Sequence, residues 1–527
     1  MGYRTPSSTR ADAAGALPPG PRMPQPLQAL GWALRPLPFM EKCRRRYGDV
    51  FTLRVRRARP WVFLSDPADV GKVLTISPEL VRAGAGEANP LLVPLLGQRS
   101  VMLLDEPEHM AHRRFMLPAF HGARMRGYGE MMAQVAREQI ASWPVGEPFA
   151  LWPRMQAISN EVVMRATFGS AEGPHMDNLR ALLQRLTDWL NDSSRLTLLA
   201  TFGSQVLSRN RRFRELMAPV EAALLEEVRR RRAAPPRQED EGILSMLEQA
   251  YDESGRPMTD QELRDELITL LSDGPTATSL SWAFERLLRH PEKMARLQAE
   301  VLGGEGEEYT EAVVKEILRL VPAVPVVMRG LVESMELGGH TIPAGTLVAP
   351  AIYLVHHRED IYPRPFAFMP ERFLASSPHR PGTGKGERPA ENYAWLPFGS
   401  GVRRCVAATF APLEMRHVIR AVIEQVELAA PSEGVQRPTR SSVSFAPGDE
   451  APVVVRRRRS PEERRRSGVG GDQPRPLDGA SGPEDEDGTS RPRGDDKSAR
   501  SEGRGEAGTR EPHVGQTSSP AGAAVGD

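Results

Sequence analysis

The stretch WLPFGSGVRRCVAATFAPLEMRHVI, residues 395–419, decides the fold. In this stretch a loop that carries Pro and Gly leads to Cys405, and an apolar, helix-like segment follows. Thiolates are stabilised at helix N-termini and beside arginines, here Arg403 and Arg404. A thiolate in an apolar collar is a suitable ligand for a haem iron that must push electron density onto oxygen. Taken alone, however, a single cysteine is more often a small buried apolar residue.

The spacing within this stretch favours the ligand interpretation. Phe398-x-x-Gly401-x-Arg403-x-Cys405 resembles the haem-binding loop of the cytochrome P450 family. The resemblance implies a haem b that is bound non-covalently, with Cys405 as the axial ligand of its iron. The family usually has a glycine two residues after the cysteine. This chain has Ala407 there, a small residue that should still allow close packing against the porphyrin.

Charged residues upstream follow in the order that this family requires. Glu316-x-x-Arg319 lies in a helical pattern, and its spacing places both charges on one face of the helix. Taken alone, such a pair is an ordinary helix ion pair. Because Pro370-Glu371-Arg372-Phe373 follows downstream, the set resembles the family's buried Glu–Arg–Arg cluster. The resemblance implies a structural role, in which Glu316, Arg319 and Arg372 hold the segment before the cysteine loop in place.

The segment DEPEHMAHRRFMLPAF, residues 105–120, resembles the family helix that reaches the haem propionates. His109 and Arg113 are four residues apart and therefore lie on one helical face, suited to gripping a carboxylate. Without the cysteine loop, such a pair would indicate a solvated surface. By the same resemblance, Arg403 and Arg329 complete a cationic clamp. The expected cofactor-binding residues are therefore His109, Arg113, Arg329, Phe398, Gly401, Arg403, Cys405 and Ala407.

Most of the remaining sequence has helical periodicity, with strand candidates near the two ends of the folded part. Apolar residues recur at helical spacing in 124–142, 212–232 and 244–251. Short apolar or glycine-broken stretches predict strands in 51–55, 61–64 and 335–348. The sequence thus predicts a mainly α protein with small β-sheets, which the resemblance identifies as the cytochrome P450 fold.

The longest predicted helix begins at Thr259, where Thr259 and Glu262 form a capping box. At roughly thirty residues and about 1.5 Å per residue, it would cross the whole domain. Gly274 and Pro275 lie in its middle. Because proline cannot donate to the carbonyl of Leu271, a kink or local opening is expected there. Such a break marks either a functional site or a harmless bend.

At this break the chain departs from the family pattern, Ala/Gly-Gly-x-Asp/Glu-Thr, whose acid and alcohol relay protons to dioxygen. In an alignment without gaps, Pro275 stands in place of the threonine and Gly274 in place of the acid. Alternatively, two residues are missing, Asp273-Gly274 replaces the Ala/Gly-Gly pair, and Thr276 is the nearest hydroxyl. Neither alignment restores the acid–alcohol pair. The candidate oxygen-activation residues are Asp273, Pro275 and Thr276.

Three functions are compatible with this departure. The freed carbonyl of Leu271 could hold a water while Asp273, Thr276 or a substrate group supplies protons, as a monooxygenase requires. Alternatively, the protein uses hydrogen peroxide or rearranges an already oxidised substrate. The arginine that accompanies a proline at this place in the peroxide-using branch of the family is absent. A non-catalytic haem-binding or partner module would keep Cys405 without a working helix.

Composition excludes several other classes of protein. The chain has 527 residues with 69 Lys+Arg and 68 Asp+Glu, and this balance argues against a nucleic-acid binder. Its two cysteines exclude a disulfide scaffold and a four-cysteine metal site, and Cys43 is expected to be a bystander. Because no run of eighteen apolar residues occurs, no membrane anchor is expected.

The two ends of the chain differ in composition from its centre. Residues 1–26 are rich in Ala, Gly and Pro, and 456–527 are rich in Arg, Gly, Pro, Ser and Glu without one aromatic residue. Such segments cannot bury enough apolar area to offset the entropy of ordering them. The sequence therefore predicts a disordered extension over 1–26, a haem domain over 27–455 and a disordered tail over 456–527.

The resemblance implies a monooxygenase that inserts one atom of dioxygen into a lipophilic small molecule. No flavin or ferredoxin domain fits in the remaining residues, so electrons are expected from a separate ferredoxin and ferredoxin reductase, and ultimately from NAD(P)H. The apolar stretches LLVPLLG and VPAVPVV favour a lipophilic substrate, although apolar lining is usual for ligand pockets. A monomer in a bacterial cytoplasm is expected.

Overall fold

Two short apolar strands near the N-terminus begin the largest sheet. β1 (Val50–Leu53) and β2 (Trp61–Leu64) are nearly all buried and pair antiparallel, which matches their hydrophobic and β-branched composition. β2 continues in parallel to β8 (Leu347–Pro350), which pairs antiparallel with β5 (Arg329–Leu331). β3 (Val81–Arg82) closes the order β1-β2-β8-β5-β3.

Of the whole chain, the computed structural model describes residues 17–55, 59–84, 92–169, 172–191, 207, 209–233, 242–272, 274–304, 306–377, 393–432, 434–441 and 444–465. These residues all belong to the first of two units of the chain, Met1–Gly471. The second unit, Asp472–Asp527, lies outside the described residues.

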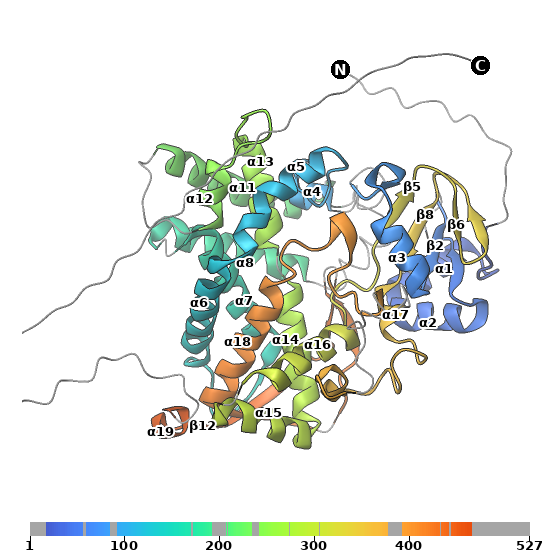
Figure 1. The fold of residues 1–527 in the computed structure, drawn as a ribbon. Helices are drawn as coiled ribbons and strands as arrows, with labels where there is room; N and C mark the ends of the chain where they lie inside the picture. The colour runs from blue at the N-terminus through green and yellow to red at the C-terminus, as the bar shows by residue number, and fades with distance from the viewer. Residues whose placement is uncertain are drawn as a thin grey trace, which may run out of the picture. The chain divides into compact units, whose positions relative to one another are not determined.

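Helices form most of the described part of this first unit (Figure 1), and the bounds that follow are those of its described elements. The α-helices are α1 (Gln25–Leu34), α2 (Pro36–Tyr47), α3 (Pro67–Thr75), α4 (Val93–Leu96), α5 (Glu108–Met116), α6 (Ala123–Ile140), α7 (Leu151–Phe168), α8 (Pro174–Leu190), α11 (Arg211–Ala233), α12 (Ile243–Gln249), α13 (Asp260–Leu271), α14 (Pro275–Leu288), α15 (Pro291–Gly303), α16 (Glu308–Leu320), α17 (Ile352–His356), α18 (Phe410–Gln425) and α19 (Pro461–Arg465). Short 3₁₀ turns include η2 (Leu117–Phe120), η3 (Pro370–Phe373) and η5 (Gly401–Arg403).

Three smaller sheets complete the strand inventory of the described residues. They are β4-β12-β9 (Pro148–Ala150, Pro452–Arg458 and Val426–Ala429) and the hairpins β6-β7 (Met335–Leu337 and His340–Ile342) and β10-β11 (Pro438–Ser441 and Ser444–Pro447). The strands and helices expected from periodicity are therefore present, with bounds that differ by a few residues at most.

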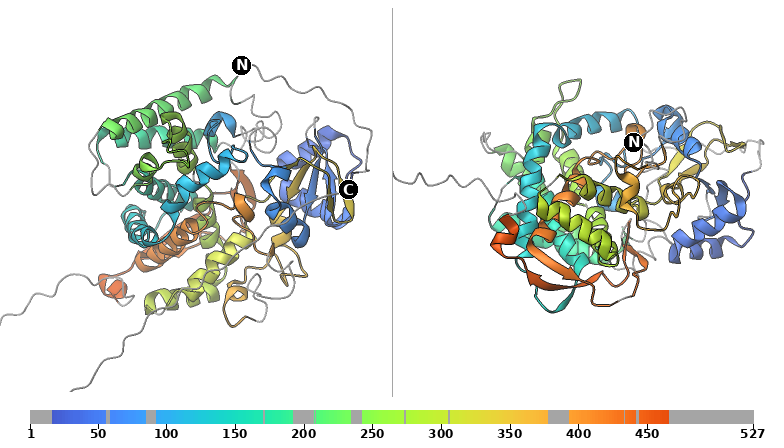
Figure 2. Two further views of the ribbon diagram at one scale, coloured as in Figure 1. Left: turned by 45° about the horizontal axis from the view of Figure 1, so that its top comes forward. Right: turned by 60° about the horizontal axis from the view of Figure 1, so that its bottom comes forward.

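The centre of the helical part is built around α18, which packs against α6, α14 and α16 (Figures 1 and 2). α14 in turn packs against α7 and β11. Trp282 of α14 is fully buried, and its indole N–H donates to the carbonyl of Phe445 in β11 at 2.7 Å. This arrangement places the N-terminus of α18, just after the cysteine loop, in contact with the main hydrophobic core.

The long helix expected from Thr259 is two helices in the structure. The capping box of Thr259 and Glu262 is present and begins α13, which ends at Leu271. α14 then begins at Pro275, so the predicted kink is a complete interruption of the helix. Proline is favoured in the first turn of a helix, because the amide hydrogen it lacks has no partner there anyway. Asp273 lies outside the described residues.

The chain is ordered before residue 27, where the sequence predicted the folded part to begin. The amide and hydroxyl of Thr52 in β1 donate to the carbonyls of Pro19 (2.9 Å) and Pro18 (2.7 Å). A Cβ at Gly20 would lie 2.0 Å from the carbonyl oxygen of Thr52, so only glycine permits this approach. Proline and glycine here serve close packing against a strand, which composition alone did not indicate.

The chain is likewise ordered beyond Val455, since β12 extends to Arg458 and α19 follows. Arg458 donates to the carbonyl of Trp143 at 2.8 Å, and Arg459, which is buried, donates to that of Ile423 at 2.8 Å. Backbone carbonyls therefore satisfy guanidinium groups that looked like part of a solvated tail.

No helix among the described residues is long and apolar enough to cross a membrane.

Candidate functional site

The cysteine loop is closed by its own backbone. The amide of Cys405 donates to the carbonyl of Phe398 at 3.0 Å. Gly401 has a φ of +67°, and a Cβ there would lie 2.1 Å from the carbonyl oxygen of Leu74 in α3. A side chain at this position would therefore be strained and would also collide with the backbone of α3. The glycine that the motif requires fixes the loop against α3.

The surroundings of Cys405 combine an exposed thiol with an apolar rim. Cys405 is exposed, whereas Phe398, Val406 and Ala407 are half-buried and pack against the main core. The carbonyl of Ala407 accepts hydrogen bonds from the amides of Phe410 and Ala411, both at 3.1 Å, which start α18. The thiol thus lies just ahead of a helix N-terminus, where a thiolate is stabilised.

The predicted cations gather beside this loop. From α5, the Nη1 of Arg113 donates to the carbonyl of Arg404 at 2.6 Å. Burial lowers the pKa of Arg113 below its usual value, and the nearby Cys405 thiol offsets part of that shift. Arg403 lies on the loop itself and is mostly buried. Burial also lowers the pKa of Arg403.

Arg329 completes the group from β5. It is 8% exposed, and its pKa is lowered to about 10, first by burial and then by the positive charge of Arg403, with Asp105 acting in the opposite direction. Two buried guanidinium groups that repel one another form a site that an anionic group would stabilise. The structure therefore brings together all four residues of the expected clamp.

Two carboxylates belong to this site although the sequence reasoning missed them. Glu106 Oε1 lies 2.6 Å from His109 Nδ1 and 3.7 Å from Arg403 Nε. Asp105 Oδ1 lies 3.6 Å from Arg403 and accepts the amide of Gly84 at 2.7 Å. Burial and Arg403 lower the pKa of His109 to about 4, so the ring is neutral at pH 7. The three-residue spacing of Glu106 and His109 was the signal that could have revealed this pair.

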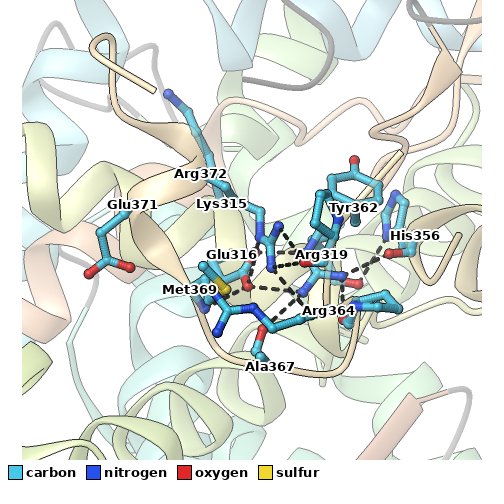
Figure 3. Close-up of polar contacts among 12 residues, drawn as sticks. Lys315, Glu316, Arg319, His356, Tyr362, Arg364, Ala367, Met369, Glu371 and Arg372 are labelled. Atoms are coloured by element: carbon cyan, nitrogen blue, oxygen red, sulfur yellow. Dashed lines mark hydrogen bonds and ion pairs between the residues drawn. The ribbon is translucent and has the colours of Figure 1, made fainter. Parts of the chain in front are cut away.

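The predicted Glu–Arg–Arg cluster is formed and buried (Figure 3). Glu316 accepts two hydrogen bonds from Arg319 at 2.7 and 2.9 Å and one from Arg372 at 3.2 Å. It also accepts the amide of Met369 at 2.8 Å. The remaining donors of Arg319 reach the carbonyls of Pro365 and His356, both at 2.8 Å. Each buried charge is therefore both paired and hydrogen-bonded.

Two further residues, also absent from the sequence prediction, connect this cluster to the cysteine loop. They are His356 and Tyr362, which Figure 3 shows beside Arg319. The Nε2 of His356 accepts the amide of Leu396 at 2.7 Å, so its Nδ1 must carry the proton, which it donates to the carbonyl of Arg319 at 3.1 Å. Burial holds the pKa of His356 well below its usual range. The hydroxyl of Tyr362 donates to the carbonyl of Ala394 at 2.9 Å. These bonds fix residues 394–396 just before Phe398.

The expected oxygen-activation region lies at the start of α14. Thr276 is buried in the first turn of that helix, directly after Pro275. The hydroxyl of Thr278 donates to the carbonyl of Gly274 at 3.2 Å, and that of Ser279 donates to Pro275 at 3.1 Å. Both hydroxyl groups are therefore bonded to backbone carbonyls at the start of α14. Asp273, the third candidate, lies outside the described residues.

Comparison with known proteins agrees with this geometry. The family model described as Cytochrome P450 matches residues 18–449. The chain belongs to the cytochrome P450 family. Cytochrome P450 135B1 of Mycobacterium tuberculosis is 40% identical over 450 residues, which cover 84% of this chain and 91% of that protein. Cytochrome P450 138 of the same organism is 34% identical over 450 residues, covering 84% and 97%.

Solved P450 structures share the fold. Cyanobacterial CYP120A1 with retinoic acid bound gives a TM-score of 0.70 at 23% identity, covering 84% of this chain and 99% of that one. The haem domain of cytochrome P450DA gives 0.68 at 22% identity, covering 85% and 99%. The predicted family and its mainly α fold with small sheets are thereby confirmed.

P450s carry a haem and are generally haem-thiolate monooxygenases, so the chain is placed among the oxidoreductases. The described residues fit such a group. Arg329 and Arg403 form the buried cationic site that propionates would stabilise, and Cys405 supplies a thiol at the edge of an apolar rim. A thiolate is the ligand by which P450s favour O–O cleavage.

Proposed function

We propose that this P450 inserts one atom of dioxygen into a lipophilic small molecule: substrate, dioxygen, two electrons and two protons give hydroxylated substrate and water. The observation that carries the proposal is the convergence of Arg113, Arg329, Arg403 and His109 beside the exposed thiol of Cys405. A haem b supplies the oxygen chemistry when bound, and the protein supplies ligation, orientation and protons.

Each residue of the site then has a defined task. Cys405 would ligate the iron of a bound haem, and its thiolate form would be favoured by Arg113, whose guanidinium lies against the carbonyl of Arg404. Arg329 and Arg403 would hold the propionates of such a haem by charge-assisted hydrogen bonds. Neutral His109 has its Nδ1 engaged by Glu106, which fixes the orientation of the ring.

Electrons in this proposal come from NAD(P)H through a ferredoxin reductase and a ferredoxin. Arg404 is exposed next to Cys405 and offers positive charge to an acidic partner on this side of the loop. Complementary charge mainly accelerates encounter, so the rate of electron transfer should fall as ionic strength rises.

The carbon monoxide difference spectrum of the reduced protein tests the ligand. We expect the red-shifted Soret band of thiolate ligation in the native protein and its loss in C405H, where an imidazole replaces the thiolate. C43A is the matched control, since Cys43 is buried and burial raises its pKa to about 11. A thiolate band that persists in C405H, or that disappears in C43A, would contradict the assignment.

A second candidate function is favoured by the interruption between α13 and α14, where the acid–alcohol pair of the family is missing. In this reading the protein uses hydrogen peroxide, or rearranges an oxidised substrate, because Pro275 and Gly274 replace that pair. In the monooxygenase proposal, by contrast, Thr276 and Asp273 are the proposed source of protons for oxygen activation.

Turnover of fatty-acid, terpene and steroid probes, driven either by ferredoxin with its reductase or by peroxide, separates the two functions. G274D/P275T restores the family's acid and alcohol. If the native protein is a peroxide user, the variant should gain ferredoxin-driven turnover by about a hundredfold or more, an amount typical of one proton-transfer group. If it is a monooxygenase with its own proton route, the native protein should already turn over with ferredoxin, and the gain should be small.

A further inference from the structure

Helix α1 turns an apolar stripe toward solvent. Met23 just before the helix, and Leu27, Leu30 and Leu34 within it, are 41, 53, 51 and 62% exposed. Their spacing of four, three and four residues places them on one side of the helix, one above the other. Single exposed apolar residues are common, but an aligned stripe of four marks an interaction surface.

The opposite side of α1 is fastened to the protein, so the helix cannot rotate to bury this stripe. Gln28 is buried, and its side-chain oxygen accepts the amide of Arg54 at 2.8 Å. The ring of Trp32 packs edge-on against Trp61 and Phe63 of β2, at 5.5 and 5.6 Å between centroids. Rotation would break these contacts and leave the polar atoms of Gln28 without partners. The outward stripe is therefore a fixed feature of the fold.

The segment that carries the stripe is positively charged. Residues 17–47 contain six basic residues and a single acidic one, Glu41. Glu41 accepts a hydrogen bond from the hydroxyl of Tyr353, which directs its carboxylate toward the protein. The basic residues that are exposed in this segment are Arg22, Arg35, Lys42, Arg45 and Arg46. In Figure 1, α1 and α2 lie at the periphery of the region that holds the largest sheet.

We propose that α1 docks on an anionic lipid surface, with Leu27, Leu30 and Leu34 in the boundary between headgroups and acyl chains. An apolar stripe flanked by arginines is the pattern of helices that lie in a membrane interface. Arg22 and Arg35, at the two ends of the stripe, would reach lipid phosphates while their stems follow the apolar surface. This is peripheral binding by a helix lying on the surface, and no part of α1 spans the bilayer.

Charge favours a lipid surface over a second copy of the chain. Two molecules that met through α1 would bring two basic surfaces together, which is unfavourable. An anionic bilayer supplies both the apolar phase and the opposite charge. Binding should therefore require anionic lipid and weaken as salt increases.

Co-sedimentation of the holoprotein with vesicles tests the proposal. We expect binding to vesicles of phosphatidylcholine mixed with phosphatidylglycerol, and little binding to pure phosphatidylcholine. L27S/L30S/L34S should lower the partition coefficient about tenfold or more, because the apolar contribution of three leucines is lost. R22E/R35E should weaken binding in a manner that depends on salt.

Matched controls alter similar residues elsewhere. V435S and Y251S change apolar side chains that are 65 and 64% exposed, and R126E/R229E reverses two exposed arginines on α6 and α11. These variants should bind vesicles like the native protein. All variants change exposed side chains, so the haem spectrum and thermal midpoint should stay unchanged, which separates this test from the proposed oxygenase function.

Three results would overturn the proposal. The first is an absence of binding to anionic vesicles. The second is equal binding to anionic and neutral vesicles, because the charge argument would then fail. The third is self-association of the lipid-free protein in sedimentation velocity that L27S/L30S/L34S abolishes, since the stripe would then be an interface between two copies.

Discussion

Replacing Glu316 by glutamine would remove the one negative charge that the described cluster places against Arg319 and Arg372. Its carboxylate accepts three guanidinium hydrogen bonds, at 2.7, 2.9 and 3.2 Å, and the amide of Met369 at 2.8 Å. Glu316 and Arg319 are fully buried and Arg372 nearly so. The glutamine oxygen keeps an acceptor, but its NH₂ group would face a guanidinium donor.

The expected cost follows from this burial. Removing one partner from a buried ion pair costs about 3–5 kcal/mol, because the remaining charge stays desolvated. The damage should reach the cysteine loop, since His356 connects the carbonyl of Arg319 to the amide of Leu396. We therefore expect the thiolate Soret band of E316Q to disappear at lower urea concentration than its helical circular dichroism.

E371Q is the matched control in the neighbouring segment. Glu371 pairs with Lys293 at 3.0 Å and with the hydroxyl of Tyr309 at 2.9 Å, but its side chain is 35% exposed. Its loss should cost at most about 1 kcal/mol. Urea unfolding, followed by the Soret band and by helical circular dichroism, measures the two variants under the same conditions. If the Soret and circular-dichroism midpoints coincided in E316Q as they do in E371Q, the structural role assigned to the cluster would be refuted.

Two further predictions concern pH and the cysteine loop. Burial and Arg319 lower the pKa of His357 from 6.5 to about 3, so the unfolded chain takes up this proton at a higher pH than the folded protein does. The free energy of unfolding should therefore fall as pH drops from 6.5 toward 3, by at most about 1.4 kcal/mol per pH unit. H357F should flatten that part of the stability curve in urea titrations at several pH values, and an unchanged slope would disprove the assignment. G401A should displace the cysteine loop from α3 and cause haem loss on gel filtration. G399A is the control, because Gly399 has a φ of +68° but no neighbour within 4 Å, so the change should cost only about 1–2 kcal/mol of backbone strain. Equal haem retention by the two variants would contradict the close approach to α3.

The sequence predicted those parts of the site that helix geometry encodes locally. Glu316 and Arg319 are three residues apart, and His109 and Arg113 are four apart, so their spacing alone places each pair on one face. The structure shows both faces directed toward the expected neighbours. Spacing is informative here because a regular helix places residues three or four positions apart on the same side.

Residues that act through backbone atoms gave no comparable signal. Tyr362 holds the carbonyl of Ala394, 32 residues away, and His356 binds the amide of Leu396, 40 residues away. Any residue has such an amide and carbonyl, so no pattern of residue types marks these partners. The same reason explains the boundary at Val455, because the arginines that follow it bind carbonyls of distant segments.

Pro275 was correctly predicted to disturb the long helix, but the sequence predicted a kink, whereas the structure has two separate helices. Pro275 ends the hydrogen-bond ladder of α13, but it is also well suited to begin α14. In the first turn of α14, the hydroxyl of Thr278 donates to the carbonyl of Gly274. A break of this kind leaves the last carbonyls of one helix and the first amides of the next without partners inside their helices. The break therefore lies at the place where the family pattern has an acid and an alcohol. G274D/P275T would restore the amide hydrogen that Pro275 lacks and add both side chains. If the variant lost the turnover of the native protein and gained none driven by ferredoxin, the break itself would be the functional element.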